Sequence, residues 1–156
     1  MILVQEADFD TAALTAALRA EVGAQAGAIV TFTGYVRDYA PGQATDTLYL
    51  EHYPGMCERE LQAIAHTARE RWRLAGTLIA HRVGALPRES QIVFVAAASA
   101  HRGDAFRGCE FMIDALKTRA PFWKRETLAD GKRFWVEQRA DDEDRTRAWE
   151  DNKEKP

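Results

Sequence analysis

The residues most able to do chemistry stand close together in LKTRAPFWKRE, residues 116–126. Lys117 and Lys124 lie on either side of a proline and of Phe122 and Trp123. Like charges crowded together repel one another, so such a cluster is favoured where it faces an anion. We expect a Pro-centred turn to fold Lys124 back near Lys117, with both aromatic rings forming an apolar wall. Desolvation and a like-charged neighbour would then lower the lysine pKa toward neutral pH, where the group can exchange protons.

Two simpler interpretations of this basic stretch remain open. Lys117 and Arg119 fall in the last turn of an expected helix, where cations interact favourably with the helix dipole and need no ligand. Lys124 lies beyond the proline, so the dipole does not explain it. Basic residues beside Phe122 and Trp123 are also typical of surfaces on which bases stack. A formal net charge of −3 over 156 residues argues against a nucleic-acid surface of that kind.

Two further stretches place positive charge at the end of an expected strand. In SAHRGDAF, residues 99–106, a buried strand runs through His101 and Arg102 directly into a helix. Free backbone N–H groups and the positive end of the helix dipole favour an anion at such a junction. In GYVRD, residues 34–38, Arg37 follows another strand at the start of a polar loop. Each stretch is also compatible with an ordinary solvated surface.

The composition excludes several classes of function. A content of 46% hydrophobic residues supports a real core. The sequence has no glycine-rich phosphate loop, and its four histidines and two cysteines lack metal-ligand spacing. We therefore expect no nucleotide, no metal and no other cofactor. The N-terminus does not resemble a signal peptide, and no apolar run approaches the roughly 18 residues of a membrane span, so we expect a cytoplasmic protein.

The hydrophobic pattern predicts an α+β domain over residues 1–140 with a mixed or antiparallel sheet and packed helices. Asp10 is a good helix N-cap. Strand 91–99 is almost continuously apolar, so we expect it to be central and covered on both faces. We expect the tail, 141–156, to be a solvated helix or frayed. The other expected elements are helices 11–22, 55–72 and 104–117, strands 28–36, 47–53 and 76–86, a loop at 38–46, and two strands, 125–128 and 132–138, around an Asp130-Gly131 turn.

Four stretches taken together resemble one known family. TFTGYVRD, LEHYPGM, SAHRGDAF and LKTRAPFWKRE are similar to the large, catalytic subunit of molybdopterin synthase and stand in the same order. The resemblance extends from about Ala28 to Arg139. It implies an α/β-hammerhead fold with a small β subdomain. It also implies a homodimer that binds a small ubiquitin-like sulfur-carrier subunit at each end, which makes a heterotetramer.

The same resemblance implies a reaction. The carrier's C-terminal Gly-Gly would end in a thiocarboxylate and would donate sulfur to cyclic pyranopterin monophosphate. Two sulfurs would form the dithiolene of molybdopterin in molybdenum cofactor biosynthesis. Both reactants are anionic, so a pocket of lysines and arginines suits this chemistry.

The resemblance also assigns residues to these roles. Lys117 and Lys124 would be catalytic. From the chemistry of the two reactants, we expect Lys117 at the thiocarboxylate, where it could stabilise an oxyanion, and Lys124 at the pterin, although the two roles could be exchanged. The substrate site would be lined by Tyr35, Val36, Arg37, His101, Arg102, Lys117, Lys124, Arg125 and Glu126.

A sulfurtransferase that uses its own cysteine is an alternative. Cys109 falls on the apolar face of an expected helix, which is typical of a buried, inert thiol. Cys57 falls in the first turn of another expected helix, where its pKa could be lowered, but no basic residue is paired with it in the sequence. We therefore expect the sulfur to come from the partner protein.

Overall fold

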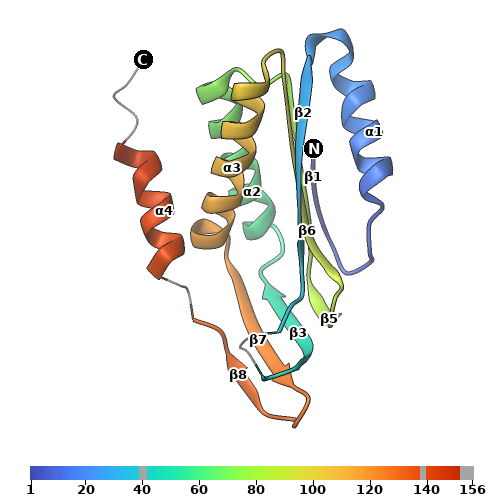
Figure 1. Ribbon diagram of the computed structural model, residues 1–156, viewed down its shortest axis with the longest axis vertical. Coiled ribbons are helices and arrows are strands. Elements are labelled where there is room, and N and C mark those ends of the chain that lie inside the picture. Colours follow the sequence, from blue (N-terminus) through green and yellow to red (C-terminus); the bar gives the residue numbers. More distant parts are fainter. Residues whose placement is uncertain (39–41, 138–139, 152–156) are drawn as a thin grey trace.

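Two four-stranded sheets organise the part of the chain that the computed structural model describes, residues 1–38, 42–137 and 140–151. The main sheet has the order β1 (Ile2–Gln5), β4 (Gly76–Arg82), β6 (Gln91–Ser99), β2 (Ala28–Tyr35). The small sheet has the order β5 (Gly84–Pro87), β3 (Thr45–His52), β7 (Phe122–Leu128), β8 (Arg133–Trp135). Figure 1 shows the small sheet below the main sheet, which makes the molecule elongated. Parts of two expected elements, 38–46 and 132–138, lie outside the described residues.

Strand pairing confirms the expected mixed or antiparallel architecture. In the main sheet, β6 lies between β4 and β2 and is antiparallel to both, whereas β1 is parallel to β4. All pairs in the small sheet are antiparallel. Residues 94–99 of β6 are buried, as the apolar run predicts for a central strand.

Helices cover both faces of the main sheet (Figure 1). α2 (Met56–Trp72) and α3 (Arg102–Arg119) pack on one face, and α1 (Thr11–Val22), followed by a 3₁₀ turn (Gly23–Gln25), packs on the other. Asp10 caps α1 as expected, because its carboxylate accepts hydrogen bonds from two backbone N–H groups at 2.8 and 3.1 Å. No helix in the described parts of the chain is long and apolar enough to cross a membrane.

One expected strand is in fact two. The structure divides residues 76–86 at Val83, so β4 ends in the main sheet and β5 begins in the small sheet. Gly84 has a φ of +77°, a left-handed conformation that glycine adopts at no steric cost. At this break the chain passes from the main sheet to the small sheet.

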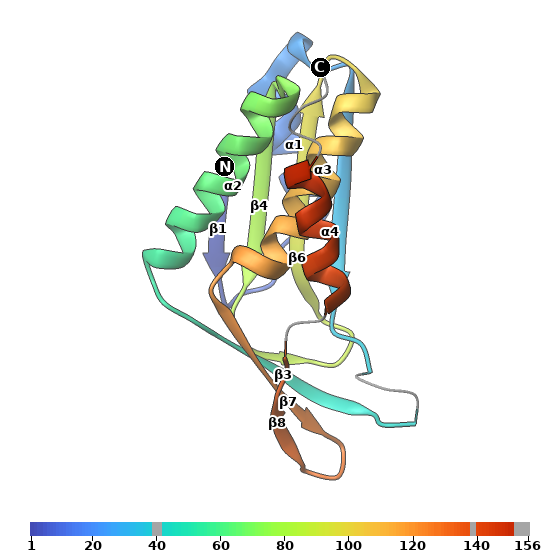
Figure 2. The same ribbon diagram turned by 90° about the vertical axis from the view of Figure 1, so that its left-hand side faces the viewer.

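The C-terminal helix α4 (Ala140–Asp151) packs on α3 and is not solvated on all sides (Figure 2). Arg145 pairs with Asp114 and Glu110 of α3, at 3.0 Å in each case. The Trp149 indole N–H donates to Asp114 at 2.8 Å, and its ring meets Trp72 edge-on. These contacts dock the charged tail on the helical layer.

Candidate active site

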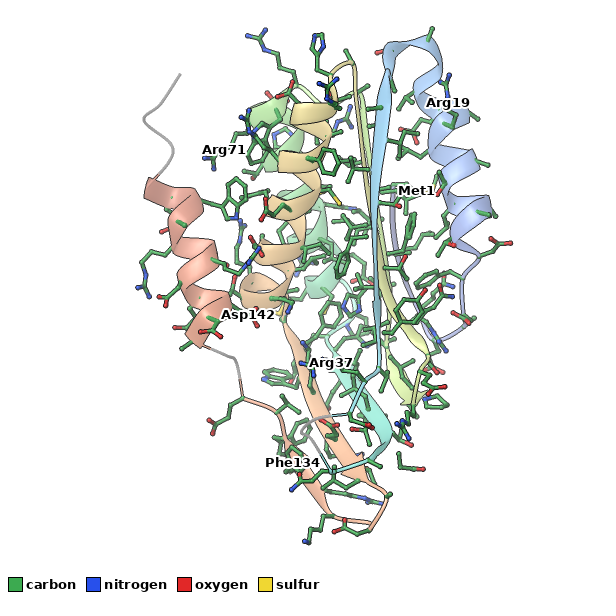
Figure 3. The ribbon with its side chains drawn as sticks, in the orientation of Figure 1. Met1, Arg19, Arg37, Arg71, Phe134 and Asp142 are labelled. Carbon is green, nitrogen blue, oxygen red and sulfur yellow. The ribbon has the colours of Figure 1, made fainter. Side chains whose placement is uncertain are left out.

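Lys117 lies at the C-terminal end of α3, which confirms that its helix ends just before Pro121. Its Nζ is 3.3 Å from Oδ1 of Asp142, near the start of α4, and its side chain is 46% exposed. Asp142 lies beside that end of α3 (Figure 3). The expectation that aromatic rings desolvate this ammonium group is therefore wrong for Lys117.

Lys124 lies on β7, which leaves α3 through a tight turn at Pro121. The Phe122 N–H donates to the Ala120 carbonyl at 2.8 Å, so the expected Pro-centred turn is present. The strand then starts at once and runs away from the helix (Figure 1), so Lys124 is not folded back over the helix end. Lys124 is paired in register with Leu50 of β3, which fixes its backbone.

His81 is a buried histidine near this lysine, and no local sequence pattern indicates it. Phe122 and Lys124 share one face of β7, because alternate residues of a strand do so. The Phe122 ring stacks on His81 of β4, with ring centres 3.9 Å apart and planes 12° apart. Burial is the main cause that lowers the pKa of His81 to about 4; the charges of Lys124 and His52 lower it further, and a hydrogen bond to the Arg82 carbonyl opposes the shift.

The opposite face of the small sheet carries Trp123 and Arg125. The Arg125 guanidinium carbon is 4.9 Å from the Tyr49 ring centre and 5.7 Å from that of Trp135, which are cation–π distances. Its Nε is buried without a hydrogen-bond partner among the described residues. Trp123 is half exposed and meets the Tyr53 ring edge-on. The two aromatic residues of the basic stretch thus lie on opposite faces of β7, and the expectation of one wall is wrong.

Glu126 of β7 and Val36, which packs against β3 and β5, are both buried at the small sheet. Glu126 is buried and accepts a hydrogen bond from the Thr45 hydroxyl. Val36 is buried too; its N–H donates to Ser90 and its carbonyl accepts from Glu89. Both side chains are therefore buried, unlike the exposed Tyr35 and Arg37 that were expected to line the same site.

Tyr35 and Arg37 lie at the lower end of β2. Both are exposed, and the Arg37 guanidinium is 3.4 Å from the backbone carbonyl of Asp38. In Figure 3, Arg37 is drawn below the helices, at the level where β7 leaves α3. The segment 39–41 that follows lies outside the described residues.

His101 and Arg102 lie at the other end of α3. His101 is the N-cap residue and Arg102 the first helical residue, and both are exposed. At about 1.5 Å per residue, the helix separates Arg102 from Lys117 by roughly 22 Å. Figure 1 shows the two ends of α3 at opposite ends of the helical layer. Within one chain, the structure does not bring these predicted site residues together.

Neither cysteine has the properties of a nucleophile. Both thiols are free and buried. Burial raises the pKa of Cys109 to about 12, and burial also raises the pKa of Cys57, whose Sγ is 3.5 Å from the Pro121 carbonyl. The suggestion of a lowered pKa at Cys57 is therefore wrong, because burial outweighs its position at the helix start. In the part of the chain that the structure describes, no group of His, Cys, Asp and Glu is arranged to hold a metal ion.

A mixed main sheet joined to a small antiparallel sheet, with helices on both faces of the main sheet, defines an α+β protein with two lysines close to the point where α3 meets β7. A family model described as MoaE protein matches residues 4–119. The chain is 52% identical over 148 residues to the molybdopterin synthase catalytic subunit of Ralstonia nicotianae, covering 95% of this chain and 83% of that protein. The chain belongs to the MoaE protein family, which confirms the resemblance drawn from the four motifs.

Solved structures agree with this assignment. Molybdopterin cofactor biosynthesis protein E from Burkholderia multivorans superimposes with a TM-score of 0.81 at 47% identity, covering 96% of each chain. A chain from the complex of subunits 1 and 2 of the Helicobacter pylori molybdopterin-converting factor has a TM-score of 0.70. At 23% identity, over 88% of this chain and 91% of that one, the second match shows a shared fold alone.

Proposed function

We propose that this chain is the catalytic subunit of a molybdopterin synthase. It transfers sulfur from the thiocarboxylated C-terminus of a small carrier subunit to cyclic pyranopterin monophosphate, and so forms the dithiolene of molybdopterin. The observation that carries the proposal is the position of Lys117 and Lys124 on either side of the α3–β7 junction, in a member of the MoaE family. Two cations there suit a reaction between two anionic partners.

Lys117 is assigned to the thiocarboxylate. The Asp142 carboxylate beside its Nζ supports this role, because a thiocarboxylate carries the same charge on a similar planar group. As an exposed residue at a helix end, Lys117 is accessible to the tail of an incoming protein. Its ammonium group would stabilise the oxyanion that forms when water adds to the acyl carbon, before the acyl–sulfur bond breaks and leaves the carrier with an ordinary carboxylate.

Lys124 is assigned to the pterin. Its strand is paired with β3, so the lysine starts from a fixed backbone position. During ring opening and sulfur addition, protons must move at the substrate, and a lysine in a partly buried setting is suited to carry them. The half-buried position of Lys124 supports this role.

We further propose that His101 and Arg102 reach the lysines from a second copy of this chain. One copy alone keeps them about a helix length away, whereas a twofold dimer can place the start of one α3 near the end of the other. The Arg102 guanidinium fork matches the oxygens of a phosphate, and the N-terminus of α3 adds a favourable dipole. This corner would hold the substrate phosphate.

The proposed assembly is a homodimer with one carrier at each end. Residues 1–140 would act as one domain, and the reaction would take place in the cytoplasm. A nucleic-acid role is the rival, and a salt-dependent mobility shift with single-stranded RNA would support it instead.

Reconstitution tests the proposed function. The purified chain is mixed with thiocarboxylated carrier and cyclic pyranopterin monophosphate, and the dithiolene product is measured by oxidation to a fluorescent pterin. We expect product only when all three components are present. A carrier with an ordinary carboxylate is the matched control and should give none. Absence of product in the complete mixture would contradict the proposal.

A further inference from the structure

His81 is a buried polar residue that the proposed chemistry leaves unused. It lies on β4, in register with Val4 of β1 on one side and Val93 of β6 on the other. Its backbone is therefore held by two neighbouring strands, and its side chain is only 7% exposed. Burying a histidine costs free energy unless its ring nitrogens form hydrogen bonds.

The orientation and the tautomer of the ring are both fixed. Nδ1 lies 2.8 Å from the Arg82 carbonyl, and a carbonyl can only accept, so Nδ1 carries the proton. Nε2 then keeps its lone pair and can act as an acceptor. The flat stack on Phe122 prevents the ring from tilting. His81 is thus a rigid, neutral side chain with one nitrogen available for another group.

The stack connects this ring to Lys124. Phe122 is the first residue of β7, and it pairs in register with His52 of β3. Any shift of the Phe122 ring would move the start of the strand, and Lys124 follows two residues later on the same face. The charge of Lys124 also lies close enough to contribute to the low pKa of His81.

We propose that His81 is a positioning residue for Lys124: its locked ring fixes the start of β7 through Phe122 and carries an unprotonated nitrogen in the neighbourhood of the lysine. The inference rests on the proposed function, because it assumes that Lys124 moves protons during sulfur transfer. With a pKa of about 4, His81 stays neutral near pH 7, so it neither repels the ammonium group nor takes its proton. Lys124 and His52 are the charged or titratable side chains that influence the ring.

The first test measures the ring directly in the chain without substrate. The pKa of His81 is followed by NMR titration in the wild type, in Lys124→Met and in the control Lys132→Met, which alters an exposed lysine in the β7–β8 turn. We expect Lys124→Met to raise the pKa of His81 and Lys132→Met to leave it unchanged. Equal values in all three proteins would overturn the proposal. This test does not need any substitution at position 81 to fold.

The second test separates positioning from general packing. His81→Phe keeps a flat ring against Phe122 but removes both nitrogens, whereas His81→Gln restores a polar group near the place of Nε2. We expect His81→Phe to lower kcat about ten- to a hundred-fold with little change in substrate KM, and His81→Gln to recover part of the loss. The exposed His66→Phe is the matched control and should keep full activity.

A double variant decides between the two roles. In a Lys124→Ala background, His81→Phe should cause no further loss of kcat, because both changes act on one group. An equal loss in both backgrounds would overturn the proposal in favour of packing alone. If the wild type makes no product while Lys124→Met still shifts the pKa of His81, the proposed function fails and the coupling between the two residues stands.

Discussion

Lys117 and Lys124 belong to one short stretch of sequence, yet the structure gives them opposite surroundings. Lys117 ends a helix, is exposed, and is held by a carboxylate on another helix. Lys124 lies on a paired strand, is half buried, and has a neutral histidine nearby. The first lysine lies at an exposed helix end, whereas the backbone of the second is fixed by strand pairing.

This difference teaches which lysine suits which reactant. A protein tail that enters and leaves at each sulfur transfer requires a cation that can exchange one anion for another. A small substrate that must be protonated at defined atoms requires a donor with a fixed position. The contrast is the reason why we assign Lys117 to the carrier and Lys124 to the pterin.

The largest expected effect is the loss of turnover in Lys117→Ala. Removing one group that stabilises an oxyanion typically lowers kcat about 10²- to 10³-fold. Because the side chain is exposed, the fold should stay intact, which circular dichroism can verify. Lys132→Ala, another exposed lysine, is the control and should turn over normally. A fully active Lys117→Ala would contradict the assignment.

The second effect concerns stability at low pH. It tests whether His81, the buried residue near Lys124, must become protonated when the chain unfolds. The pKa of His81 is lowered to about 4 in the folded chain. Between about pH 6.5 and 4 the unfolded state therefore binds a proton that the folded state does not, so stability falls as the pH falls. Complete protonation corresponds to a loss of up to about 3 kcal/mol.

Urea unfolding at pH 7.5, 5.5 and 4.5, at one protein concentration, checks this. His81→Phe should lose less free energy of unfolding than the wild type between these pH values, and His66→Phe should follow the wild type. Identical pH dependence in all three proteins would show that His81 is not the group responsible.

The third effect distinguishes the binding site of the substrate phosphate from that of the carrier thiocarboxylate. Arg102→Ala should weaken substrate binding by about ten- to a hundred-fold, the value of one charge-assisted hydrogen bond, and should change carrier affinity much less. Isothermal titration of each ligand measures this, with Arg73→Ala, another exposed arginine, as the control. Loss of carrier affinity with intact substrate affinity would mean that the two ends of the site are reversed.

The smallest expected effect is that of Asp142→Asn. The Lys117 side of this ion pair is exposed and the Asp142 side is only partly so. Ion pairs at the surface contribute about 0.2 to 1 kcal/mol, so we expect only a small change in the free energy of unfolding. If Lys117 can exchange partners as proposed, carrier affinity should stay the same or rise slightly, because a competing anion is gone. A marked loss of carrier affinity would contradict this, because it would show that Asp142 positions Lys117 for the carrier and does not compete with the carrier.

The local elements of this fold were predictable, whereas the links between the sheets were not. The Asp10 cap and the apolar run of β6 are visible within a few residues, and both expectations were confirmed. The break at Val83 depends on pairing between β5 and β3, which are far apart in the chain. The role of His81 was not predicted for the same reason, because it depends on a stack with Phe122, which is distant in the sequence.

The distance between Lys117 and the pair His101 and Arg102 could have been predicted from the expected helix between them. A helix over 104–117 already places His101 and Arg102 before its start and Lys117 at its end. A rigid helix of that length cannot bring its two ends together, so the motifs of one chain cannot form one pocket. Whether a second copy closes the gap depends on docking between chains, which local sequence patterns do not encode.

Mixing two inactive variants tests the central claim most directly, namely that each site combines the lysines of one copy with His101 and Arg102 of another. Lys117→Ala and a His101→Ala/Arg102→Ala double variant are unfolded together, refolded as a mixture, and assayed with carrier and substrate. In a twofold dimer, random pairing leaves one intact site in half of the dimers, so the mixture should recover about a quarter of wild-type activity. If the mixture stays as inactive as its components although mixed dimers have formed, the account of a shared site is contradicted.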